Sequence, residues 1–328
     1  MTDALNEIFD FLGGKIGGLA ETVLYGTIIK FCVQFLEFLG KLILQTGCSL
    51  YNTLIKLSGS FLTQSPKDWM GGSGWAEIQK INDGFIVVGL TLITVFWLVA
   101  FFSEVTDFRS EIRLEKMLIN LTRLSVAQWL VCHSLDIVGA LFSLVGDLIP
   151  GGTSSMEIDV NYVVNTMEAY AEDNYTLQSL ALMAGIILMG AIFALVMVVI
   201  GVLILKTSFV RFFKVLIIVP YGALASSTVA GTHAVSSSAV SFYKYALNCI
   251  LEAVTMIIAI KVYASLVGSM SKFMMDGNLG KSVTVSTASF IDIGISLGGS
   301  LLIQIILALA MDYLIKEAST ITQRALNL

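Results

Sequence analysis

The chain has 328 residues, of which 56% are hydrophobic and 13% are charged, and its formal net charge is −5. Soluble domains carry about 25% charged residues, so this composition excludes an ordinary soluble domain and predicts an integral membrane protein. The negative net charge also argues against a basic domain that binds nucleic acid strongly. The four cysteines form no CxxC pair and there are two histidines, so we expect no metal site, no disulfide scaffold and no cofactor.

Residues 1–83 predict an amphipathic or interfacial helical region that includes a loop. Lys30, Glu37 and Lys41 interrupt an apolar run at spacings of seven and four residues, which places them on one helical face. This pattern suits a helix at the membrane interface or against other subunits, and a true span is the alternative. Glycines between residues 13 and 18 favour a hinge. The loop over residues 63–82 contains two tryptophans, which suit the headgroup level.

The stretch Gly84 to Ser103 predicts the first clear span, at the start of a transmembrane domain over residues 84–315. The densest Lys/Arg cluster of the chain follows, over Glu104 to Arg123. Basic residues tend to stay in the cytoplasm, so we place this cluster there. The segment from Leu118 to Ile149 then returns as one long helix with a polar stripe.

The longest apolar run, Leu180 to Leu205, contains no charge and no proline. With about 26 residues at about 1.5 Å each, it is long enough to cross a hydrocarbon core of roughly 30 Å with some tilt. The preceding segment, residues 150–178, has five acids and no Lys or Arg, so we expect an external acidic loop. The basic residues expected on the cytoplasmic side are Arg109, Arg113, Lys116, Arg123, Lys206, Arg211 and Lys214.

The next segment, Phe212 to Gly231, admits two topologies. It contains Pro220 and Gly222 among small residues. Proline interrupts a helix, so the segment is either a short kinked span or a re-entrant segment. Re-entry is favoured because it leaves the basic C-terminal residues in the cytoplasm. The remaining spans are expected over Tyr245 to Val267 and Val285 to Leu314, and a short tail over residues 316–328. In total we expect an all-α bundle with about five spans and one broken segment.

Polar side chains inside the expected spans are the candidate functional residues, because lipid-facing positions reject them. Helical spacing places them in one stripe on each of three spans. Such stripes predict a hydrated path or a subunit interface, and hydrogen bonding within a static bundle is the alternative. The candidates are Ser125, Asp136, Ser143 and Asp147 on one span, Glu252 and Thr255 on the next, and Asp292 and Ser296 on the last.

Motifs for catalysis receive no support. The sequence GNLGKS at residues 277–282 imitates the end of a phosphate-binding loop, but Met275 occupies the position that the first glycine requires. The sequence has no HExxH pattern, and no GxSxG pattern accompanies a positioned histidine. We therefore expect that the protein is not an enzyme.

Residues Val210 to Ala264 carry a recognisable pattern. A basic aromatic start is followed by an apolar run, Pro220, small residues, a polar gap and a long span. This pattern, with the preceding span and acidic loop, resembles the TrbL/VirB-type polytopic channel subunit of type IV secretion (conjugal transfer) systems. The resemblance covers about residues 80–315 and includes no catalytic signature. It implies a structural role for the segment from Pro220 to Ser227.

The resemblance implies a non-catalytic, multi-pass scaffold or channel component of a conjugation or secretion apparatus in the bacterial cytoplasmic membrane. Such a subunit acts as a homo-oligomer with partner ATPases and other secretion subunits, and contacts the transported single-stranded DNA or protein transiently. The alternative is a secondary transporter or ion-conducting protein, which the broken segment and the intramembrane acids would suit. That alternative lacks a second broken segment in a matching position.

Overall fold

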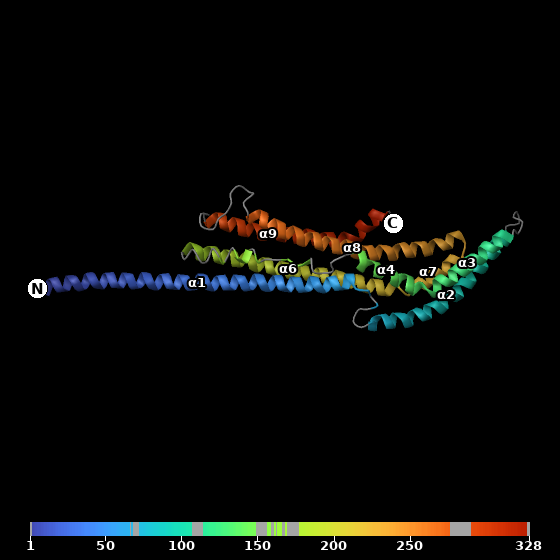
Figure 1. Cartoon of the computed structure of the whole chain (residues 1–328), viewed down its shortest axis with the longest axis horizontal. Helices are drawn as coiled ribbons and strands as arrows, with labels where there is room; N and C mark the ends of the chain where they lie inside the picture. Colours follow the sequence, from blue (N-terminus) through green and yellow to red (C-terminus); the bar gives the residue numbers. More distant parts are fainter. Residues whose placement is uncertain are drawn as a thin grey trace. The chain divides into compact units, whose positions relative to one another are not determined.

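A computed structural model describes the chain as a set of long helices (Figure 1). Among the described residues there is no strand. The described residues are 2–65, 67, 72–106, 114–148, 156–158, 161, 163–165, 168, 177–275 and 290–326. The helices are α1 (Thr2–Thr63), α2 (Ser73–Thr106), α3 (Leu114–Cys132), α4 (Ser134–Leu148), α6 (Leu177–Ile218), α7 (Tyr221–Ser227), the 3₁₀ turn η3 (Thr228–Ala230), α8 (His233–Met275) and α9 (Phe290–Leu326). The expected all-α class is therefore confirmed.

Four of the described helices contain a segment long and apolar enough to cross a membrane. The segments are Ser73–Ser103 in α2, Met183–Ile218 in α6, Val235–Ser269 in α8 and Gly298–Ala325 in α9. A fifth candidate is the bent pair formed by α3 and α4. Each segment is long and apolar enough to cross a hydrocarbon core of roughly 30 Å. The chain is therefore a multi-pass membrane protein.

The chain divides into two compact units, and each combines segments that are distant in the sequence. The first unit contains residues 1–53, 158–201 and 263–310, and the second contains residues 54–157, 202–262 and 311–328. Helices α1, α6, α8 and α9 therefore contribute residues to both units.

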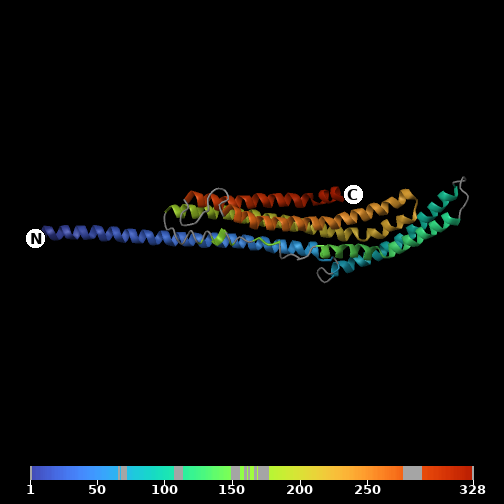
Figure 2. The same ribbon diagram turned by 45° about the horizontal axis from the view of Figure 1, so that its top comes forward.

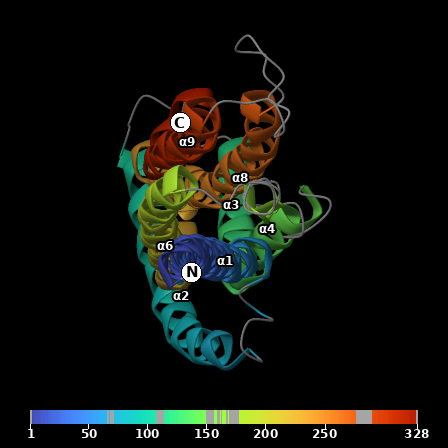
Figure 3. The same ribbon diagram turned by 90° about the vertical axis from the view of Figure 1, so that its left-hand side faces the viewer.

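In the first unit, α1 packs directly on α6, and the two helices run in the same direction. A Cβ atom added to Gly190 would meet the Leu44 side chain at 3.3 Å, and one added to Gly47 would lie 2.5 Å from the Cβ of Ala194. Figure 3, which looks along the helices, shows α6 beside α1. Small residues allow two helix backbones to approach this closely. The part of α1 from Leu44 to Gly47 is thus packed against α6.

In the second unit, α7 and η3 fill the space between α2 and α3, and Figure 2 shows α2 and α3 side by side. Their shared core consists of small and branched side chains, namely Ile93, Ala127, Val131, Ala223 and Ala230. Gly89 lets α2 approach α7, because a Cβ atom there would lie 3.1 Å from the backbone oxygen of Ala223.

A second core joins α1, α2, α4, α6 and α8. It contains Phe61, Trp75, Leu135, Val138, Phe212, Val215, Leu216, Val219 and Cys249.

Three local features differ from the sequence expectations. The hinge expected between residues 13 and 18 is absent, because α1 is a continuous helix of 62 residues. The helix expected from Leu118 to Ile149 is bent by 61° at His133. At the bend, the Ser134 hydroxyl donates a hydrogen bond to the Val131 carbonyl oxygen (3.0 Å), and a ring nitrogen of His133 lies 3.0 Å from the Trp129 carbonyl oxygen. Such local side-chain bonds compete with regular helical bonding.

The third difference concerns the segment Phe212 to Gly231. Its first residues continue α6 to Ile218, and the last helical bond runs from the Val219 amide to the Val215 carbonyl (3.2 Å). Pro220 has no N–H to continue the series, so α6 ends and Pro220 begins α7 as its N-cap. Helix α7 has seven residues and is about 10 Å long, which is too short to cross the membrane alone. The structure thus has a break at Pro220 and no separate kinked span.

Candidate functional site

The most unusual side chain of the second unit is Arg211, a cation buried inside the helical bundle. Its exposed fraction is 5%, although it lies within the apolar segment Met183–Ile218. An isolated charge at the centre of a membrane costs about 2.5–3.5 kcal/mol even on lenient scales. Arg211 therefore needs partners, and α8 provides them.

The partners of Arg211 lie on one face of α8, at residues 249 to 256. The guanidinium group donates hydrogen bonds to the carbonyl oxygens of Cys249 and Ile250, the second at 3.2 Å. It also donates to the Met256 sulfur at 3.4 Å. The Nε atom lies 4.0 Å from Oε2 of Glu252, whose side chain is 14% exposed. The planar guanidinium can serve several acceptors at once, which suits it to such a position.

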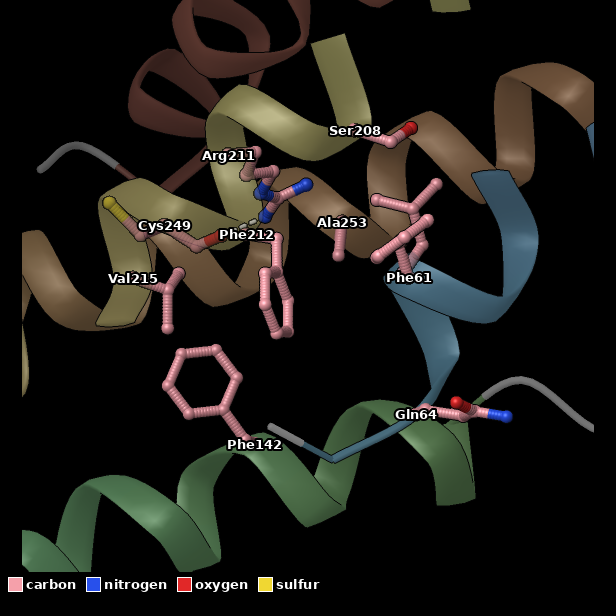
Figure 4. A pocket seen from close by; sticks show the side chains of 10 residues that line it. Phe61, Gln64, Phe142, Ser208, Arg211, Phe212, Val215, Cys249 and Ala253 are labelled. Carbon is pink, nitrogen blue, oxygen red and sulfur yellow. Dashed lines mark hydrogen bonds between the residues drawn. The ribbon is translucent and has the colours of Figure 1, made fainter. Parts of the chain in front are cut away.

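A small cavity lies beside this cation, in the second unit. Figure 4 shows the rings of Phe142, from α4, and Phe212, from α6, projecting into it. Ser208 and Gln64 add polar groups to the lining. The cavity volume is about 30 Å³, and roughly 10–15 Å³ of such space is enough to hold one water molecule. This space suits a bound water and is too small for a transported solute.

Other hydroxyl groups in the second unit also join helices. The hydroxyl oxygens of Ser58, in α1, and Ser208, in α6, lie 2.5 Å apart. Those of Thr255, in α8, and Thr322, in α9, lie 3.0 Å apart. The sequence identified Thr255 and Glu252 as candidates, and the structure places both side chains in contacts between helices.

The candidates on α3 and α4 do not join helices in this way. Ser125 and Ser143 are exposed and donate to backbone oxygens of their own helices, at 3.1 and 2.7 Å. Asp136 is also exposed. The bend at His133 separates Ser125 from Asp136 and Ser143, so the common face expected for a continuous helix does not extend across it. The side chains of Asp147, Asp292 and Ser296 lie outside the described residues, although their backbones belong to α4 and α9.

The broken segment brings small residues close to its neighbours. A Cβ atom added to Gly222 would meet Phe242 and Ser134 at 3.5 Å, which is ordinary contact. The hydroxyl groups of Ser226 and Tyr243 lie 2.7 Å apart. Pro220 and Gly222 therefore place α7 against α4 and α8.

The basic residues expected to mark the cytoplasmic side have different environments. Arg123 and Lys206 are exposed, whereas the ammonium group of Lys214 lies over the ring of Tyr245, 5.3 Å from its centre. Arg211 differs from these three because it is buried and ion-paired. Arg109, Arg113 and the side chain of Lys116 lie outside the described residues.

Sequence reasoning missed a contact between α1 and the acid-rich segment 150–178. In the first unit, the Asn52 side chain donates to the Ile158 carbonyl oxygen (2.9 Å) and accepts from the Ile158 amide (3.0 Å). Lys41 pairs with Glu168 there, and the hydrogen bond that the Lys41 ammonium group donates to this carboxylate raises the pKa of Lys41. In the second unit, Lys56 pairs with Glu157 at 2.8 Å. The available signal was the opposite charge of the two elements: α1 carries lysines, and the segment 150–178 has acids and no Lys or Arg.

Across the part of the chain that the structure describes, no group of three or more His, Cys, Asp or Glu side chains is placed to hold a metal ion. No protein-family model, curated protein or solved structure matches this chain.

Proposed function

We propose that this chain is a non-catalytic scaffold or channel subunit of a type IV secretion (conjugal transfer) apparatus in a bacterial cytoplasmic membrane. The observation that carries the proposal is the pattern of Val210 to Ala264, which includes the end of α6, α7 and most of α8. In this region Arg211 of α6 donates to a carbonyl oxygen of α8, and the hydroxyl groups of Ser226 in α7 and Tyr243 in α8 are hydrogen-bonded. Such bonds favour a subunit that holds a fixed shape in an assembly.

The cavity beside Arg211 has about 30 Å³ and is not a site for a small-molecule substrate, because such pockets have about 300–1,000 Å³. In the proposed apparatus the substrate path is formed between copies of the subunit, together with other secretion subunits, and partner ATPases supply the energy. The substrate is single-stranded DNA or protein, which the subunit contacts transiently.

The experiment is genetic and biochemical. Donor cells lacking the gene should transfer DNA far less often, and the wild-type gene should restore transfer. The full chain, purified in detergent after mild cross-linking, should be a homo-oligomer with secretion ATPases bound. As a matched control, a multi-pass protein of the same membrane with the same tag should capture none of these ATPases. Normal transfer without the gene, or a monomer that never associates with secretion subunits, would contradict the proposal.

A secondary transporter is the second candidate, and the helix break at Pro220 favours it. Broken helices expose backbone groups that can bind ions near the middle of a membrane. In this alternative, purified protein in liposomes would show proton flux coupled to a substrate. Asp292→Asn would abolish this flux, and Lys80→Gln on the exposed surface of α2 would leave it unchanged. Our proposal predicts no coupled flux for the wild-type protein.

A further inference from the structure

The part of helix α3 from Met117 onward carries one charged side chain on an exposed apolar surface. From Met117 to Cys132 the helix contains a single ionisable residue of the Lys, Arg, Asp or Glu type, Arg123. The neighbouring side chains of Leu118, Ile119 and Val126 are exposed by 57%, 47% and 46%. An apolar exposed face is ordinary where lipid is the solvent, but an arginine on such a face needs a specific explanation.

These side chains line an open groove between α3 and η3. Thr122 and Arg123 are its polar lining residues, and Val229 of η3 forms part of the opposite wall. The groove has a volume of about 430 Å³, which lies within the usual range of about 300–1,000 Å³ for small-molecule sites. Its walls are largely apolar, so a suitable ligand has an apolar body and a group that pairs with a cation.

The guanidinium group of Arg123 is available for such a ligand. No ion pair joins it to a carboxylate in the described part of the chain. The Thr122 hydroxyl beside it donates to the Leu118 carbonyl oxygen (2.8 Å), so it does not occupy the guanidinium. Arginine presents five donors in a planar fork that matches the oxygens of a phosphate group.

The depth of the groove in the membrane follows from the same residues. Arginine side chains are stable in a membrane helix where they reach the headgroups. Arg123 lies about 9 Å along the helix from Met117, where the apolar bent pair of α3 and α4 begins. Its position near this end places the groove where phosphate groups and acyl chains meet.

We propose that this groove binds an anionic phospholipid, with its phosphate on Arg123 and an acyl chain along Leu118, Ile119 and Val126. Charge complementarity selects an anionic lipid over a zwitterionic one, because the choline of phosphatidylcholine brings a second cation to the groove. The inference rests on the membrane location of the chain and is independent of the secretion function.

The test is native mass spectrometry of the full chain, purified in detergent and titrated with phosphatidylglycerol or phosphatidylcholine. Wild-type protein should retain one phosphatidylglycerol molecule more tightly than phosphatidylcholine. Arg123→Gln should weaken retention about tenfold or more, because a hydrogen bond to a charged group contributes at least that factor. The matched control is Arg324→Gln, which removes an exposed arginine in the last turn of α9 and should leave retention unchanged.

A second variant keeps the test valid if Arg123→Gln does not fold. Val126→Trp fills the apolar wall and leaves the charge, so it should also weaken phosphatidylglycerol retention. Inorganic phosphate at the same concentration should not compete, because it lacks the acyl chain. Equal retention of both lipids, full competition by phosphate, or retention unchanged by both groove variants would overturn the proposal. If the wild-type protein is an oligomer in these spectra and Val126→Trp is a monomer with unchanged lipid retention, the groove is a contact with a second copy, and this result would also overturn the proposal.

Discussion

The contact of α6 with α8 at Arg211 and the contact of α6 with α1 at Gly47 join helices by different chemistry. At Arg211 a buried cation bonds to carbonyl oxygens and lies 4.0 Å from a carboxylate. At Gly47 the missing side chain lets two backbones approach, with no polar group involved. In lipid, apolar surface alone gives helices little reason to associate, so both polar bonds and close packing are used. Helix α6 therefore contacts its neighbours through polar bonds at one place and through close packing at another.

The largest effect is expected at the charged contact. Arg211→Ala leaves Glu252 buried without its partner, which should lower the free energy of unfolding by about 3–5 kcal/mol. Equilibrium unfolding in detergent micelles would measure this. The control is Lys80→Ala, which breaks an exposed pair with Glu77 and should change stability by about 0.2–1 kcal/mol. An equal effect of the two variants would show that Arg211 is not a buried partner.

The close-packed contact should respond to added volume. In Gly47→Ala the new Cβ would lie 2.5 Å from the Ala194 Cβ and 2.9 Å from its Cα, so the helices must separate. Such overpacking costs about 1–3 kcal/mol. Gly185→Ala is the matched control on α6, where a Cβ meets nothing within 4 Å; there alanine should stabilise the helix by about 0.5–1 kcal/mol. If thermal unfolding gave both variants the same sign, the close contact would be refuted.

A smaller effect is expected where α1 holds the acid-rich segment. Asn52→Ala removes both hydrogen bonds to Ile158 and should cost about 1 kcal/mol, because water can replace part of the lost bonding. Hydrogen exchange at the Ile158 amide should become faster. Asn52→Asp keeps an acceptor for this amide and should preserve more of its protection. Unchanged exchange in both variants would contradict the contact.

The smallest effect is expected at the exposed pair between Lys56 and Glu157. The two side chains are 53% and 41% exposed, and exposed pairs contribute about 0.2–1 kcal/mol. Lys56→Gln should therefore change the thermal midpoint slightly, and less at high salt, since mobile ions screen the pair. A large loss that persists in high salt would show that this pair belongs with the Arg211 contact.

Hydropathy predicted the all-α bundle because the membrane as solvent selects long apolar runs. The break at Pro220 was also predictable, since proline lacks the donor that a helix needs. The bend at His133 was not, because the apolar pattern continues through it and neither proline nor glycine marks it. Hydropathy also scores each helix by itself. It identified Arg211 as a basic residue of the cytoplasmic side and Glu252 as an acid inside a span, and it could not show that the two side chains meet.

The central claim is that Arg211 of α6 and Glu252 of α8 act as one coupled buried pair. A double-mutant cycle tests this most directly, with unfolding measured for Arg211→Leu, Glu252→Leu and the two together. Both single variants should be strongly destabilised. The double variant should return close to wild type, because replacing a whole buried pair with apolar side chains is often neutral or stabilising, whereas breaking it is not. Single effects that simply add in the double variant would contradict the claim.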